Sequence, residues 1–371
     1  MNKVQIGSLQ LITIFANLVY GKAVGYTNGT IVRVVGNDAW LSMAAAFLTG
    51  ALIMPAMVWL TRRRGSESPM EYIPKLLGRP LGSLVMLLMG IWFIGAYITS
   101  SITITQHIND YLMTETPLIL FVVGYTALTA YGAWLGVEVV ARLSVLGLVM
   151  AALLNLAMAL GSISHVDPTR LLPFFDHGVL PVIAASARGD TDVAMATASA
   201  LILLPLCSAS AQRWLRICWW GLGTGGVLVL IWTIFEITVL GPEMTAQYLI
   251  ACMQMARAAE LSIYLHRYEM IMVVMFVYAV VTQSVICLYC AVGLTGGALR
   301  VKVGRGYLIG AVALLAMGPQ YYLALDRDHY GAFLSVVWPP ISIALAYATP
   351  LFLCLVALFR PAPKKATISN V

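Results

Sequence analysis

The feature that most constrains this sequence is a series of ten long apolar runs. They occupy residues 6–31, 40–60, 82–109, 117–134, 138–161, 178–206, 214–241, 268–297, 306–325 and 332–359. Each run is close to the ~20 residues that a helix needs to cross about 30 Å of hydrocarbon. Strands of a membrane barrel instead alternate polar and apolar residues over segments of about 10 residues. The sequence therefore predicts an all-α integral membrane protein embedded in a lipid bilayer.

Lysine and arginine are distributed unevenly between the loops that these spans define. Of the 22 basic residues, 15 lie on the side of the two termini, Lys22 and Arg188 lie inside spans, and the opposite loops hold Arg33, Arg170, Arg257, Arg267 and Arg327. Short loops rich in Lys and Arg remain cytoplasmic. We therefore expect both termini in the cytoplasm. The net charge of +6 is then a topology signal, and we expect no nucleic-acid partner.

The number of spans suggests an internal repeat. Ten spans divide into two sets of five, and an odd number per set makes the second set cross the membrane in the opposite direction. We expect one transmembrane domain over residues 1–371, with inverted repeats at approximately 1–161 and 170–360 and a short cytoplasmic tail at 361–371. In such 5+5 folds, helices 1 and 6 are typically broken near the midplane.

Spans 1 and 6 are interrupted at corresponding places. Span 1 contains Tyr20-Gly-Lys-Ala-Val-Gly-Tyr-Thr-Asn-Gly29, and span 6 contains Arg188-Gly-Asp-Thr-Asp192. Glycine permits unwinding, and an unwound turn exposes peptide groups whose partial charges suit ammonium and carboxylate groups. We therefore expect two broken helices that face each other and hold a small zwitterion. The alternative is that the GxxxG spacing of Gly21, Gly25 and Gly29 lets unbroken helices approach closely.

Four segments resemble spore germination receptor B subunits, over nearly the whole chain. They are Ser68-Pro-Met-Glu-Tyr-Ile-Pro-Lys-Leu-Leu-Gly-Arg-Pro-Leu-Gly82, Gly136-Val-Glu-Val-Val-Ala-Arg142, Leu240-Gly-Pro242 and Ala256-Arg-Ala-Ala-Glu-Leu-Ser-Ile-Tyr-Leu-His-Arg-Tyr-Glu269. The resemblance implies the 5+5 fold of the amino acid–polyamine–organocation superfamily. It also implies a germinant-recognising subunit of an inner spore membrane receptor, with partner A and C subunits. His266 and Phe276 depart from the family pattern, which has a glutamate and a tryptophan there.

Lys22 is the leading candidate for a functional residue. An ionisable group inside a membrane is expensive, so it is expected to serve function and to have a partner. Asp190 and Asp192 are the expected partners, because spans 1 and 6 face each other in this fold. The Lys22 amine either takes the place of a coupling cation or helps to form the ligand site. The alternative is that Lys22 snorkels outward beside Arg33.

The other candidate ligand-binding residues lie at a similar depth in spans 1, 3, 6 and 8. They are Tyr20, Gly21, Gly25, Tyr26, Tyr97, Ser101, Ser186, Arg188, Gly189, Asp190, Thr191, Asp192, Tyr278 and Gln283. Arg188, Asp190 and Asp192 form either an internally paired cluster or a grip on the ligand. The residues of spans 3 and 8 either line the site or make interhelical hydrogen bonds.

Two features near the outer side complete the expectations. Glu236, near the outer end of span 7, is expected to be in contact with water and is assigned no role. Residues 243–264 are amphipathic and too polar to span the membrane, so we expect them to form a helix over the outer mouth, as a lid.

The sequence favours a binding protein over an enzyme. It contains no nucleophile–base pair, metal-ligand cluster or phosphate-binding loop that fits the membrane spans, so we expect no cofactor and no metal. The first hypothesis is a receptor subunit that binds an amino acid or other small nutrient at the membrane midplane and signals to the A and C subunits. The alternative is a proton- or cation-coupled amino acid transporter. The fold alone does not separate these functions.

Overall fold

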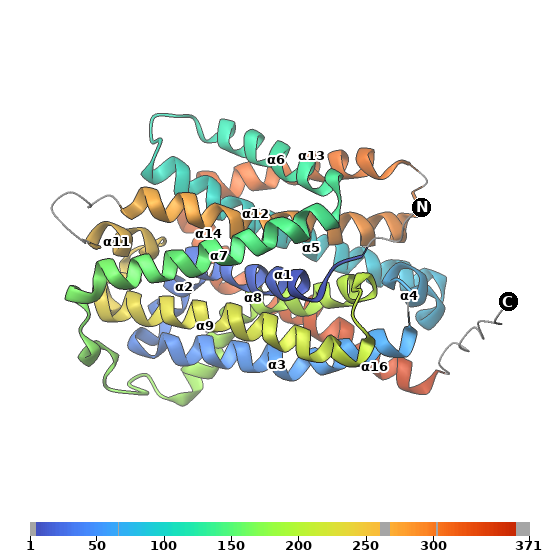
Figure 1. Cartoon of the computed structure of the whole chain (residues 1–371), viewed down its shortest axis with the longest axis horizontal. Helices are drawn as coiled ribbons and strands as arrows, with labels where there is room; N and C mark the ends of the chain where they lie inside the picture. The colour runs from blue at the N-terminus through green and yellow to red at the C-terminus, as the bar shows by residue number, and fades with distance from the viewer. Residues whose placement is uncertain (1–4, 66, 260–267, 302, 361–371) are drawn as a thin grey trace.

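The computed structural model describes residues 5–65, 67–259, 268–301 and 303–360. Nine helical stretches of these residues are long and apolar enough to cross a membrane, and four of them lie in the first half (Figure 1). The longest of the four forms two crossings, so this half has five. The first combines α1 (Ser8–Lys22), the π-helix η1 (Ala23–Thr27) and α2 (Asn28–Val35). The next four are α3 (Ala39–Arg64), α5 (Arg79–Tyr111), α6 (Leu118–Leu135) and α7 (Val137–Ser162).

The second half contains five further crossings. Four of them are α8 (Val179–Leu203), α9 (Trp214–Leu240), α12 (Tyr268–Leu299) and α13 (Arg305–Leu325). The last combines α14 (Arg327–Ala332), η7 (Phe333–Val337), α15 (Trp338–Ser342), η8 (Ile343–Ala348) and α16 (Thr349–Phe359). The predicted spans are thereby confirmed, each to within a few residues at its ends.

The connections between crossings are short helical pieces. They are α4 (Pro69–Leu77), α10 (Pro242–Gln247), α11 (Ala251–Ala258) and the 3-10 turns η2 (Gly36–Asp38), η3 (Ile163–His165), η4 (Pro168–Leu171), η5 (Leu204–Leu206) and η6 (Ala211–Arg213). The helical stretch Ser8–Arg64 has 57 residues, which corresponds to roughly 85 Å and exceeds one bilayer crossing. Gly36, at φ 54°, adopts a backbone conformation open to glycine and divides this stretch into two crossings.

The packing of the helices has the symmetry of an inverted repeat. The first crossing of each half packs extensively against the second crossing of the other half. α1 packs against α9, and α8 packs against α3. The third crossings of the two halves, α5 and α12, pack against each other, and so do the fourth crossings, α6 and α13. Exchanging the two halves therefore reproduces these four contacts. α1 and α8 lie in the middle of the bundle, and α6 and α13 lie at one edge (Figure 1).

The prediction of broken helices is wrong for span 6 and is modified for span 1. α8 winds without interruption through residues 188–192. Span 1 stays helical, but its hydrogen bonding changes to the π pattern over Ala23–Thr27. The physical reason lies in the neighbours of the glycines, because their missing side chains make room for other helices.

Close approach explains the interior glycines of spans 1 and 6. A Cβ at Gly21 would lie 2.4 Å from Gln283 Oε1, and one at Gly25 would lie 2.4 Å from Thr103 Cγ2. A Cβ at Gly189 would lie 2.8 Å from the Cβ of Ala46. The alternative derived from the GxxxG spacing therefore describes these helices better than unwinding does.

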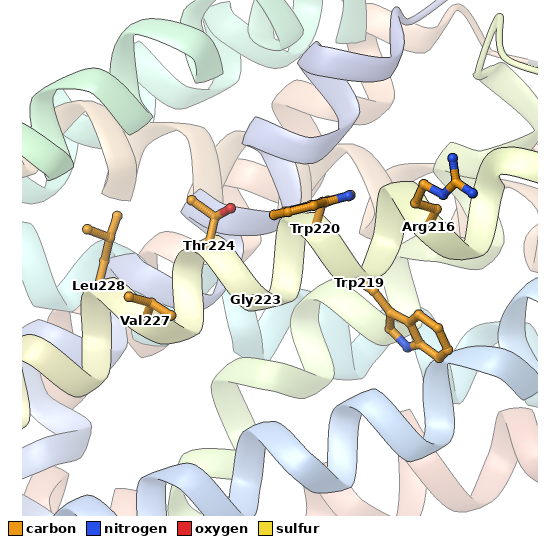
Figure 2. Close-up of a pocket in the computed structure, with 7 residues that line it drawn as sticks. All are labelled: Arg216, Trp219, Trp220, Gly223, Thr224, Val227 and Leu228. Carbon is orange, nitrogen blue, oxygen red and sulfur yellow. The ribbon is translucent and has the colours of Figure 1, made fainter.

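The same requirement appears where α9 packs on α1. A Cβ at Gly225 would lie 2.7 Å from the Ala16 carbonyl oxygen and 2.3 Å from Val19 Cγ2. Gly223, two residues away, faces out of the bundle and has no atom within 4 Å of a built Cβ. Figure 2 shows this outward face, where Trp219 and Val227 border the position of Gly223.

We predict that Gly225→Ala destabilises the protein and that Gly223→Ala does not. The added methyl at position 225 meets backbone atoms of α1, and such overpacking typically costs about 1–3 kcal/mol. At position 223 the methyl meets nothing, and alanine is the better helix former. Thermal unfolding of the purified variants in detergent measures both effects. Equal melting temperatures for the two variants would contradict the proposed packing of α9 on α1.

Candidate functional site

A buried ion pair joins the first helices of the two halves. Lys22 Nζ, on α1, lies 2.9 Å from Asp192 Oδ1, on α8, and both side chains are 1% exposed. The ammonium also donates to Thr27 Oγ1 at 2.8 Å and to Thr191 Oγ1 at 3.1 Å. Three oxygens, from Asp192, Thr27 and Thr191, therefore surround the ammonium. Of the two predicted partners of Lys22, Asp192 is found, whereas Asp190 makes no ion pair with it in the described part of the chain. The snorkelling alternative is wrong because the Lys22 side chain is buried.

Each carboxylate oxygen of Asp192 has a partner in the first span. Thr27, in η1, donates its hydroxyl to Asp192 Oδ2 at 2.6 Å, while Lys22 lies against Oδ1. Span 1 thereby supplies both the cation and the hydrogen-bond donor that stabilise the Asp192 carboxylate. A buried charge without such partners would be strongly destabilising.

Gln283, on α12, satisfies backbone groups of span 1 beside the ion pair. Its Oε1 accepts from the Lys22 backbone N–H at 3.0 Å, and its Nε2 donates to the Leu18 carbonyl at 2.7 Å. These are the two groups that a regular α-helix pairs with each other. The sequence analysis expected a ligand to meet the backbone of span 1 here. In the structure a side chain of span 8 does so, and Gly21 leaves room for it.

The π-helix follows directly after Lys22 and carries Tyr26 toward α5. Single π-helical segments within α-helices are frequent at functional sites. The Tyr26 hydroxyl donates to Gln106 Oε1, and Gln106 Nε2 donates to the Ala324 carbonyl at 2.9 Å. The Tyr26 ring packs edge-on against Tyr330, with centroids 5.3 Å apart. These side chains form a plug, which we define as Tyr26, Gln106 and Tyr330.

α11 covers the π-helix. Cys252 Sγ donates to the Gly25 carbonyl at 3.8 Å and lies 3.4 Å from His107 Nε2. Burial raises the pKa of the Cys252 thiol well above its usual range, because the charged form loses its solvation. The residue is therefore a neutral thiol that packs and donates weakly. Neither His107 nor Cys252 was a sequence-based candidate.

Glu236 is a second buried carboxyl group, and the expectation that it contacts water is wrong. Its side chain is 1% exposed. Asn28 Nδ2 donates to Oε2, and Trp232 Nε1 donates to Oε1 at 2.9 Å. The sequence signal was available, because any carboxyl inside a span is a functional candidate. Its position near the end of span 7 led to the wrong inference.

Arg188, Asp190 and Asp192 do not form the predicted cluster. Asp190 is two residues from each of the others on the continuous helix α8, so it does not face them. Arg188 and Asp192 are four apart and share a face, but Asp192 pairs with Lys22 instead. Asp190 accepts from the Tyr347 hydroxyl at 3.3 Å. Among the described residues, Arg188 makes no ion pair with either aspartate, and Thr191 donates to its carbonyl at 2.8 Å.

The remaining candidate ligand-binding residues make hydrogen bonds within the bundle or are buried in it to different degrees. The Tyr97 hydroxyl hydrogen-bonds Thr129 Oγ1 at 2.9 Å, between α5 and α6, which confirms the interhelical alternative for Tyr97. Tyr20 accepts from Asn155 Nδ2 at 2.9 Å. Ser186 donates to the Ile183 carbonyl of its own helix. Ser101 is fully buried, whereas Tyr278 is only partly buried.

The expected lid is divided into two short helices. α10 and α11 are separated by Tyr248, Leu249 and Ile250, and Ile250 has φ −118° and ψ 67°, which is not helical. The single amphipathic helix predicted over 243–264 is therefore wrong as far as residue 259. Residues 260–264 of that prediction, with His266 and Arg267, lie outside the described residues.

We predict that Lys22→Met strongly destabilises the chain and that a second change, Asp192→Asn, restores most of the stability. The single variant leaves a buried carboxylate without its cation, which typically costs about 3–5 kcal/mol. The double variant is neutral. Thermal unfolding in detergent measures both variants.

Lys75→Ala is the matched control for this experiment. It breaks an exposed pair with Glu67, in which Lys75 is 61% exposed, and such pairs contribute at most about 1 kcal/mol. If the Lys22 variant were no less stable than the Lys75 variant, the ion pair would have no structural importance.

Comparison with solved structures identifies the fold. MhsT, solved in complex with L-phenylalanine, superimposes with a TM-score of 0.65 at 12% identity, over 95% of this chain and 99% of that one. A manganese transporter from Eremococcus coleocola gives a TM-score of 0.60 at 14% identity, over 95% of this chain and 77% of that one. The inverted-repeat membrane fold is therefore shared with transporters.

Comparison of sequences identifies the family. The chain is 20% identical to spore germination protein KB of Bacillus subtilis (strain 168), over 97% of this chain and 96% of that protein. The family model described as "Spore germination protein" matches residues 5–320. Together with the bundle, these matches indicate a membrane protein without enzymatic activity. The chain belongs to the spore germination protein family.

Proposed function

We propose that this chain is the germinant-recognition subunit of a spore germinant receptor. In this proposal it binds an amino acid or other small nutrient near the membrane midplane, beside Lys22 and Asp192. It acts in the inner spore membrane, with both termini in the cytoplasm, and passes the signal to A and C subunits. The family membership supports the role in germination, and the fold shared with MhsT supports the kind of ligand.

The Lys22–Asp192 pair is the single observation that carries the proposal. It is fully buried and joins α1 to α8, the first helices of the two halves. A zwitterion brings one carboxylate and one ammonium, which match the two members of the pair. Such a ligand can exchange partners with Lys22 and Asp192 without leaving an uncompensated charge in the bundle.

Binding at this pair requires a change of conformation. Lys22 and Asp192 are 1% exposed, so the ligand binds a state in which α1 and α8 have separated. A ligand that binds only this open state shifts the population toward it by its differential affinity. In the proposal, contacts of the open state with the partner subunits transmit the signal.

The lysine also supplies a fixed positive charge at the junction. Its ammonium lies among the oxygens of Asp192, Thr27 and Thr191, and oxygen ligands of this kind also suit hard cations. We therefore propose that Lys22 replaces a coupling cation. A receptor of this design responds to its germinant without sodium.

We predict that spores carrying the Lys22→Met/Asp192→Asn variant lose the response to their germinant. The double variant keeps the bundle neutral, so the chain is expected in the membrane at normal abundance. The germinant concentration for half-maximal germination is expected to rise about tenfold or more, which corresponds to about 1.4 kcal/mol. Immunoblots of the spore membrane control for abundance, and the exposed Lys75→Ala variant controls for the manipulation. An unchanged response at unchanged abundance would refute a role of the pair in recognition.

A proton- or cation-coupled amino acid transporter is the second candidate, because the solved structures with this fold include a manganese transporter. The two functions differ in the net movement of ligand. Proteoliposomes that contain this chain alone are loaded with buffer and supplied with labelled amino acids under a proton or sodium gradient. Accumulation that depends on the gradient would favour transport, whereas binding without accumulation would favour the receptor.

A further inference from the structure

A polar pocket lies at the outer end of the bundle, the end that carries Gly36 and that the distribution of basic residues places outside. Its volume is about 240 Å³, and its lining includes Arg33, Asp110, Tyr111, Tyr248, Arg327 and Asp328. These residues come from the ends of α2, α5 and α14 and from the segment between α10 and α11. Pockets for drug-sized ligands measure about 300–1,000 Å³, so this pocket suits a smaller molecule.

The plug separates this pocket from the Lys22–Asp192 pair. Tyr26 lies about one turn beyond Lys22 and about two turns before Arg33 on the same span. Its hydroxyl is held by Gln106, and its ring packs on Tyr330. The pocket is therefore a distinct place from the buried pair and is reached first from the outside.

One carboxylate oxygen of Asp110, Oδ2, has no hydrogen-bond partner in the described part of the chain. Arg327 Nη2 lies 2.5 Å from Asp110 Oδ1. The Asp110 side chain is 10% exposed, and its Oδ2 is buried without a hydrogen-bond partner among the described residues. Leaving such an acceptor unpaired is costly. A ligand ammonium would satisfy it.

Arg33 presents the opposite charge to the same pocket. Its Nε donates to the Ala246 carbonyl at 2.8 Å, which holds the guanidinium in place. Within the described part of the chain, no carboxylate lies within ion-pair distance of Arg33. A guanidinium binds a carboxylate through two parallel hydrogen bonds. A second cation, Arg257, lies over the Tyr111 ring at 4.8 Å and adds positive potential at the pocket wall.

We propose that this pocket is a separate binding site for the zwitterionic head of an α-amino acid. The ligand carboxylate binds Arg33, and the ligand ammonium binds Asp110 Oδ2. A simple anion would leave Asp110 Oδ2 without a hydrogen-bond donor, and a simple amine would leave Arg33 without a carboxylate. The site deepens the proposed function by giving the ligand class a place to bind outside the plug, and it rests on that function only for its physiological meaning.

Equilibrium binding to the full chain in lipid nanodiscs tests the site. The background is Lys22→Met/Asp192→Asn, which removes the proposed central site, and the probes are glycine, L-serine and L-valine. The background protein is expected to bind at least one of them. Arg33→Gln and Asp110→Asn are each expected to weaken that binding about tenfold or more, because each removes a charged hydrogen bond.

Two analogues of L-valine, each lacking one of the charged groups, test the two contacts separately. Valinamide lacks the carboxylate, so Arg33→Gln is expected to leave its affinity unchanged. Isovalerate lacks the ammonium, so Asp110→Asn is expected not to weaken it. Arg170→Gln and Asp176→Asn, at another pocket of the same end, are matched charge controls and are expected to change neither affinity.

Three results would overturn the outer site. The background protein binds none of the three amino acids, or its binding is insensitive to both variants, or the two control variants weaken it equally. Failure of the proposed function gives a different result. In that case spores with the Lys22→Met/Asp192→Asn variant germinate normally, whatever the nanodisc measurements show.

Discussion

The structure depends on the burial of one ammonium group in a membrane bundle. Lys22 lies in the first span with 1% of its side chain exposed. Placing a lysine at the centre of a membrane helix costs about 2.5–3.5 kcal/mol even by insertion scales. The helices that surround it therefore have to supply a carboxylate and hydroxyl groups at one point, which fixes how α1 and α8 meet.

The sequence predicted the spans and the partner of Lys22 well, because both follow from burial in lipid. Long apolar runs have few alternatives to transmembrane helices, and Asp192 is one of the few carboxylates inside a span. The repeat then brings spans 1 and 6 together. No knowledge of side-chain packing was needed for these inferences.

The same sequence reasoning failed where the answer depended on a distant residue. Gly21 is equally compatible with an unwound turn and with a close neighbour. The residue that distinguishes the two is Gln283, 262 positions later in the sequence. Its amide occupies the space beside Gly21 and hydrogen-bonds to backbone groups of α1. Likewise, Arg188 and Asp192 lie four apart on the continuous helix α8, but Asp192 pairs instead with Lys22 of α1. Neither of these contacts can be inferred from the residues that are adjacent in the sequence.

The electroneutrality of the bundle gives a physical reason for selecting zwitterions in the proposed function. The Lys22–Asp192 pair has no net charge, and an ion added alone to it would leave one charge unpaired in a region of low dielectric. A zwitterion adds one charge of each sign, so each member of the pair can keep an opposite charge after α1 and α8 separate. At the outer end, Arg33 and Asp110 line one pocket without pairing with each other, and Asp110 pairs with Arg327. The same class of ligand would therefore satisfy both places, while amines and simple acids would satisfy neither.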